Sequence, residues 1–110
     1  MATTPVDLYR LGNAAGARLD RPRPGKDVIQ YLRNDAFWVR SRSGGVSTTA
    51  NRPSGPGIWW RLPAGAAYDE GVLFVWNDHG NHWSWEPAFD MPWTDFVEAL
   101  VQANRLFIRA

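Results

Sequence analysis

Apolar and polar residues alternate along much of the chain, and strict alternation is typical of half-buried β-strands. The pattern predicts strands at residues 6–11, 36–40, 46–49, 58–62, 72–76, 82–85 and 106–108. In the strand that begins at His82, the polar His82, Ser84 and Glu86 share one face, and Trp83 and Trp85 share the other. The alternation therefore gathers three polar groups on one face of this strand.

Helical spacing is clearest near the end of the chain. Pro92, a favoured residue of a first helical turn, precedes an apolar stripe made of Trp93, Phe96, Val97, Leu100 and Val101. A shorter helical turn is predicted at residues 27–32, capped by Asp27. Glycine and proline predict loops or turns at residues 13–26, 43–45, 51–57, 63–65 and 77–81. Together these elements predict a single α+β domain over residues 1–110.

Composition narrows the chemistry of this domain. A chain of 110 residues buries enough surface to fold without disulfides or metal staples, and seven tryptophans supply a dense core. The absence of cysteine excludes thiolate chemistry and zinc-finger sites. The first residues lack a charged start followed by an apolar run, and no stretch approaches the ~20 apolar residues of a membrane span. We therefore expect a cytoplasmic protein without a cleaved export signal.

The charge of the chain is nearly balanced, at +1, which gives no reason to expect nucleic acid or a membrane as partner. The basic residues are nonetheless almost all arginine, since Lys26 is the one lysine among twelve basic residues. Planar guanidinium groups suit phosphate and carboxylate ligands. A GC-rich genome would produce the same bias.

Several short motifs follow one another in a definite order. They are Leu8-Tyr9-Arg10, Gly44-Gly45-Val46-Ser47-Thr48-Thr49, Leu62-Pro63-Ala64-Gly65 with Gly71-Val72-Leu73, and His82-Trp83 followed by Pro87, Asp90-Met91-Pro92 and the helix. In this order, from Asp7 to Leu100, the chain resembles small toxin effectors of the type VI secretion system with an ADP-ribosyltransferase-like fold. The resemblance implies a split antiparallel sheet with a C-terminal helix and a cleft that holds NAD.

The resemblance also assigns the residues that bind NAD. Arg10, at the end of the first strand, matches the residue that contacts the nucleotide, and Tyr9 precedes it. Ser47 and Thr48 lie in a run that resembles the Ser-Thr-Ser element on the nicotinamide side. Trp59, next to another indole, is a candidate to stack on adenine or nicotinamide.

Two residues are predicted to be catalytic on the same grounds. Glu86 matches the late glutamate that stabilises an oxocarbenium-like ribose, and His82 matches a histidine followed by an aromatic residue. Ser84 stands where classical transferases have a second Glu or Gln, which argues against transfer to arginine. The implied activity is cleavage of the nicotinamide–ribose bond, with ADP-ribose passed to a macromolecule or to water. A small immunity protein is the implied partner, and delivery into a recipient cell the implied route.

Other interpretations of the same residues remain open. His82, Glu86 and the arginines would also serve a small metal-independent ribonuclease as acid, base and phosphate clamp. A non-catalytic module could use the tryptophans as a stacking platform for sugar or peptide. Asp78, His79 and His82 have spacing typical of metal ligands, but two histidines without a convincing third ligand do not predict a metal site.

Overall fold

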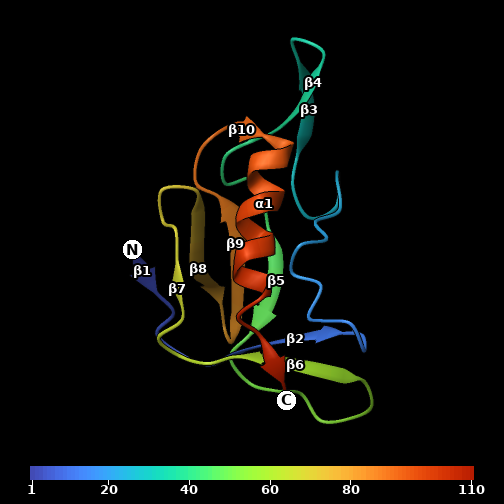
Figure 1. Cartoon of the computed structure of the whole chain (residues 1–110), viewed down its shortest axis with the longest axis vertical. Helices are drawn as coiled ribbons and strands as arrows, with labels where there is room; N and C mark the ends of the chain where they lie inside the picture. Colours follow the sequence, from blue (N-terminus) through green and yellow to red (C-terminus); the bar gives the residue numbers. More distant parts are fainter.

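The main sheet consists of six antiparallel strands in the order β11-β6-β2-β5-β9-β8. The computed structural model describes all 110 residues and is drawn in Figure 1. The strands of this sheet are β2 (Leu8–Gly12), β5 (Val46–Thr49), β6 (Ile58–Leu62), β8 (Leu73–His79), β9 (His82–Pro87) and β11 (Ile108–Arg109). The predicted strands at 46–49 and 58–62 are confirmed with the same bounds, and those at 6–11, 72–76 and 82–85 are confirmed with displaced ends. The strand predicted at 106–108 is found at 108–109, so it shares only Ile108 with the prediction.

The sheet is split between β2 and β5. These two strands share a single register pair, Tyr9 with Thr49. By contrast, β2 pairs with β6 from Leu8 to Gly12, and β5 pairs with β9 along its whole length. Figure 1 shows β2 and β6 lying crosswise at the ends of β5, β8 and β9. A gap therefore opens between β2 and β5 beyond Tyr9.

Two smaller sheets complete the β-structure. β4 (Ala36–Val39), the strand predicted at 36–40, lies between β3 (Gln30–Arg33) and β10 (Met91–Pro92). β1 (Ala2–Thr3) pairs with β7 (Ala67–Tyr68). The short strands β1, β7 and β10 are too brief to leave an alternating pattern in the sequence.

The helical turn predicted at residues 27–32 is wrong, because residues 30–33 form strand β3. A two-residue turn joins β3 to β4 at Asn34 and Asp35, whose φ angles are 50° and 62°. Positive φ at both positions is the geometry of a type I′ hairpin turn, which asparagine and aspartate tolerate. The carboxylate of Asp27 caps no helix and instead accepts hydrogen bonds from Arg23. A short apolar run fits either period, and here the turn decides in favour of a hairpin.

The loop predicted at residues 77–81 is also largely wrong, because β8 continues to His79 and β9 begins at His82. Asn77 closes this tight hairpin by donating hydrogen bonds to the carbonyls of Gly80 and His82, both at 2.8 Å. The register shifts between Asn77 and His79, so the strand contains a bulge there. As a result Asp78 and His79 lie against His82 rather than in a free loop.

The predicted C-terminal helix is confirmed as α1 (Trp93–Asn104), with Pro92 at the N-cap. Phe96, Leu100 and Ala103 are its buried residues. They join a single core with sheet residues such as Leu8 and Trp85, neither of which is exposed. The protein is thus an α+β domain of mostly antiparallel sheet with one C-terminal helix, and this helix is too short and too polar to cross a membrane.

Candidate functional site

A polar cleft of about 360 Å³ opens beside the split between β2 and β5. It is lined by Arg10, Arg18, Arg21, Arg23, Asp27, Val46 and Ser47. Three of the arginines come from the irregular segment that follows β2, and Arg10 comes from β2 itself. Four guanidinium groups against one carboxylate give the cleft a positive field suited to an anion.

Arg10 is the least exposed of the four arginines in this cleft. It donates hydrogen bonds to the Ser47 carbonyl at 2.7 Å and to the Arg18 carbonyl at 3.2 Å, so it spans the gap that the split leaves. Its Nε is buried and has no hydrogen-bond partner within the protein. Burial lowers the pKa of Arg10, because desolvation disfavours the charged guanidinium, and Asp27 opposes this effect. An anion in the cleft would offset the same desolvation.

The other arginines differ in how far they are already neutralised. Arg23 forms a two-point ion pair with Asp27, at 3.1 and 3.2 Å, and this hydrogen bonding raises the pKa of Arg23. Arg18 and Arg21 are exposed and form no ion pair. Their charges are therefore available to a ligand.

A chain of hydrogen bonds leads from the edge of the cleft to a carboxylate. The Ser47 hydroxyl lies 2.8 Å from Nε2 of His82, and Nδ1 of His82 contacts Oδ1 of Asp78. Burial opposes ionisation of Asp78, but its hydrogen bond to His82 and the nearby histidines hold its pKa below the ordinary value. An ionised Asp78 accepts a hydrogen bond from the Nδ1–H of His82. In a neutral His82 the unprotonated Nε2 is then the acceptor that faces Ser47.

The strand register aligns further polar side chains with His82. Directly opposite residues share a face of a sheet. Tyr9 lies opposite Arg61 and Thr49, Thr49 lies opposite His82, and His82 lies opposite His79. These five residues form one row across β6, β2, β5, β9 and β8, and Ser47 lies on the same face, opposite Ser84.

The chain matches no family model, no curated protein and no solved structure.

Glu86 lies on the same face as His82 and Ser84, but the structure does not bring it into the cleft. Only 5% of its surface is exposed, and it accepts a hydrogen bond from Nε1 of Trp76 at 2.5 Å. A Cβ atom at Gly45 would lie 2.7 Å from the Glu86 side chain, so the backbone of Gly45 covers it from the side. The carboxylate is closed in by Trp76 and Gly45.

The remaining predicted residues have different surroundings. Thr48 is buried, donates to the Trp83 carbonyl and accepts from Nε1 of Trp85, both at 3.1 Å, so its hydroxyl is used within the fold. Trp59 is half-buried and pairs with Leu11 in the half of the sheet that holds β2 and β6. The structure thus brings together Arg10, Ser47 and His82, with Tyr9 in the row of His82, and leaves Thr48, Trp59 and Glu86 outside the cleft.

Sequence reasoning missed the arginines of residues 18–23 and the role of Asp78. The dense run of arginines was visible in the sequence, but only the fold shows that it lies against Arg10. Asp78 was noted only for its spacing with the two histidines, and the loop predicted at residues 77–81 gave no reason to expect its contact with His82.

A larger concavity lies elsewhere on the molecule. A groove of about 710 Å³ lies between α1 and strands β7 and β8, and most of its lining is apolar. Asp69, Asp95 and Glu98 lie among its lining residues, and it contains no arginine and no histidine. It offers volume for a ligand, but its charged side chains are carboxylates and it lacks the arginines that suit the smaller cleft to an anion.

Proposed function

We propose that this chain is a toxin domain of the ADP-ribosyltransferase type. It binds NAD at the split between β2 and β5 and breaks the bond between nicotinamide and its ribose. ADP-ribose then passes to a macromolecular acceptor or to water. The observation that carries the proposal is the partly buried Arg10 guanidinium, with its unpartnered Nε, at the base of an arginine-lined cleft that borders Ser47.

The pyrophosphate of NAD is the part that this cleft suits best. Guanidinium groups bind phosphate oxygens by parallel charge-assisted hydrogen bonds. Arg10 lies among the lining residues and its Nε is buried without a partner, while Arg18 and Arg21 offer exposed charge. Loss of one such contact typically costs about 1.5–3 kcal/mol, which corresponds to about a 10- to 100-fold loss of affinity.

The nicotinamide ribose is then directed toward Ser47 and the row that contains Tyr9 and His82. When the C1′–N bond breaks, its electron pair leaves with nicotinamide and positive charge develops on C1′. The Ser47 hydroxyl and the Asp78 carboxylate behind His82 stabilise this charge electrostatically. The attacking hydroxyl or water forms a bond to C1′ and loses its proton, which Nε2 of His82 accepts through Ser47.

The proposed fold follows from the same split, because a sheet whose two halves separate next to a nucleotide cleft is what the sequence resemblance implies. The proposed partner is a small immunity protein that covers the arginine cleft with its own carboxylates. Delivery by a type VI secretion apparatus is proposed on the sequence resemblance.

The test is nicotinamide release from NAD by the purified chain, with NAD-induced stabilisation against heat as a second readout. We expect Arg10→Ala to lower both strongly. Since Arg10 also bonds two carbonyls of the fold, Arg21→Ala serves as a second variant, because its exposed side chain makes no hydrogen bond or ion pair. Arg52→Ala, in the exposed segment between β5 and β6, is the matched control and should behave like the wild type.

Two outcomes would overturn the proposal. One is the absence of both nicotinamide release and NAD-induced stabilisation in the wild type. The other is equal losses in the Arg10, Arg21 and Arg52 variants, which would remove the cleft from the reaction.

A ribonuclease is the second candidate, because an arginine cleft next to a histidine also suits an RNA phosphodiester. Such an enzyme needs both a base and an acid at the phosphate. His82 is the one imidazole that contacts a residue of the cleft, so histidine supplies only one of these two groups. Loss of RNA integrity at low protein concentration, without nicotinamide release, would favour this candidate. Ligand binding that is retained when His82 and Glu86 are changed together, without any turnover by the wild type, would favour a binding module instead.

A further inference from the structure

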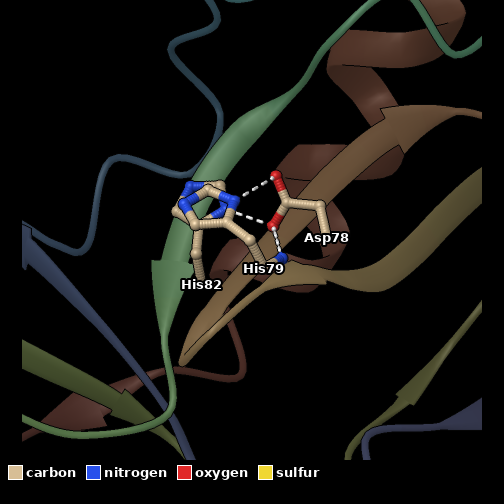
Figure 2. A group of neighbouring side chains, drawn as sticks. All are labelled: Asp78, His79 and His82. Carbon is tan, nitrogen blue, oxygen red and sulfur yellow. Dashed lines mark hydrogen bonds and ion pairs between the residues drawn. The ribbon is translucent and has the colours of Figure 1, made fainter.

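The hairpin between β8 and β9 gathers three side chains that commonly bind metals. The candidate donor atoms of Asp78, His79 and His82 all lie within 4.8 Å of one another. Figure 2 shows the two imidazole rings lying one over the other, with the carboxylate of Asp78 directed toward both. The sequence spacing left Asp78 unconvincing as a third ligand, and the structure places its carboxylate beside both histidines.

The geometry of this cluster is well defined. The ring centroids of His79 and His82 are 4.7 Å apart, and the ring planes differ by 15°. Each carboxylate oxygen of Asp78 faces a different ring, with Oδ2 lying 3.2 Å from Nδ1 of His79 and Oδ1 in contact with Nδ1 of His82. Two Nδ1 atoms and one carboxylate therefore lie together at the end of the hairpin, and the tight hairpin fixes the backbone that carries them.

We propose that Asp78, His79 and His82 bind a divalent first-row metal ion of the zinc type. Zinc takes imidazole nitrogen and carboxylate oxygen at about 2.0–2.2 Å in a tetrahedral arrangement, which sets neighbouring donors about 3.3 Å apart. The 3.2 Å between Nδ1 of His79 and Oδ2 of Asp78 already matches this value, and the other donor atoms, all within 4.8 Å of one another, would reach it by side-chain rotation. The His79 side chain is 75% exposed, so the fourth position is open to water.

Metal binding has a consequence for Ser47. A metal on Nδ1 of His82 replaces the Nδ1 proton that is hydrogen-bonded to Asp78. The proton of the neutral imidazole then lies on Nε2. Nε2 then donates to the Ser47 hydroxyl instead of accepting from it, across the same 2.8 Å contact. The metal therefore reverses the direction of the hydrogen bond that joins His82 to the cleft.

The direct test is calorimetric titration of the whole chain with ZnCl₂, with no nucleotide present. We expect one site, which Asp78→Asn and His79→Ala each weaken at least about tenfold, since even residues behind metal ligands contribute about 10- to 100-fold. Because His79 is largely exposed, its replacement leaves the fold intact. Glu98→Gln, an exposed carboxylate on α1, is the matched control and should bind like the wild type.

Nitrogen NMR of His82 supplies an independent readout. Zinc should move the signal of Nδ1 to that of a metal-bound nitrogen and place the proton on Nε2. Absence of a saturable site overturns the proposal, and so does an affinity that His79→Ala leaves unchanged or a His82 tautomer that zinc does not alter.

A further readout rests on the proposed NAD reaction. With Nε2 protonated, His82 cannot accept the proton of the attacking group, so zinc should lower nicotinamide release by the wild type and leave His79→Ala unaffected. If the chain releases no nicotinamide under any condition, the proposed function fails, while the titration still decides the metal site.

Discussion

His82 and Glu86 occupy opposite ends of β9 on one face of the sheet, yet their surroundings differ sharply. The His82 side chain is 29% exposed and contacts Ser47 and Asp78. Glu86 is 5% exposed and lies beneath Trp76, although Trp76 itself is 39% exposed. Strand alternation settles which face a side chain takes, but the neighbouring strand settles whether a ligand can reach it.

The largest expected difference between the two ends is catalytic. In the proposed reaction, His82→Ala should lower nicotinamide release about 10²- to 10⁴-fold, the usual contribution of a general acid or base. Glu86→Gln keeps the volume of the side chain and should cost much less, because Trp76 and Gly45 separate Glu86 from the cleft. Equal losses in the two variants would contradict this difference and would mean that Trp76 moves aside in the working enzyme.

The second prediction concerns packing at the closed end of β9, where Trp76 and Gly45 cover Glu86. Gly45→Ala would place a Cβ atom 2.3 Å from the Trp85 carbonyl and 2.7 Å from both the Ser84 hydroxyl and the Glu86 side chain. We expect the free energy of unfolding to fall by about 1–3 kcal/mol, as for other overpacked sites, measured by urea denaturation. Gly16→Ala is the control, because its nearest contact, 3.7 Å to Asn104, is ordinary. A wild-type denaturation midpoint for Gly45→Ala would contradict this prediction, because it would show that the neighbours of Gly45 accommodate the added methyl group.

The smallest effect is expected at Asp90, just beyond the closed end of β9. Hydrogen bonds from the Ser41 N–H and then from the Tyr31 hydroxyl hold the pKa of Asp90 below its ordinary value. Since the folded-state pKa is the lower one, the ionised carboxylate stabilises the fold above the unfolded-state value of about 3.9. This contribution is lost as the pH falls through the folded-state pKa.

Asp90→Asn should therefore show a shallower loss of stability than the wild type between pH 5 and pH 3, roughly the range of carboxylate titration. Urea unfolding at several pH values measures the difference. Asp35→Asn is the control, because its exposed carboxylate forms no ion pair. Parallel pH curves for the wild type and Asp90→Asn would exclude a stabilising role for these hydrogen bonds.

Long periodic segments were predictable from the sequence, and short ones were not. The stripe of α1 and the alternation of β9 extend over enough residues to separate helix from strand. Residues 27–32 do not, and the hairpin there depends on two positive φ values at Asn34 and Asp35. Likewise, the extension of β8 to His79 depends on the Asn77 side chain, which satisfies backbone carbonyls that a free loop would leave to water.

The site divides in the same way. Arg10, Ser47 and His82 were identified from local sequence, and the structure joins them by direct contacts. The arginines of the segment after β2 line the cleft because of the path that this irregular segment takes. An irregular path leaves no periodic pattern in the sequence, so their position could not be predicted. The burial of Glu86 depends on Trp76 in a different strand, and such pairing is a property of register rather than of local pattern.

The order of the strands also determines when the cleft can form during synthesis. Arg10 lies in the first strand of the main sheet, but β2 pairs with β6, and the face that carries Ser47 needs β9 beside it. Such pairings between distant segments are made late, whereas the β3–β4 hairpin closes locally. A ribosome-bound chain that has not yet released residues 82–87 therefore holds its arginines and Ser47 without His82. The proposed activity would accordingly arise only once residues 82–87 have left the ribosome and β9 has paired with β5.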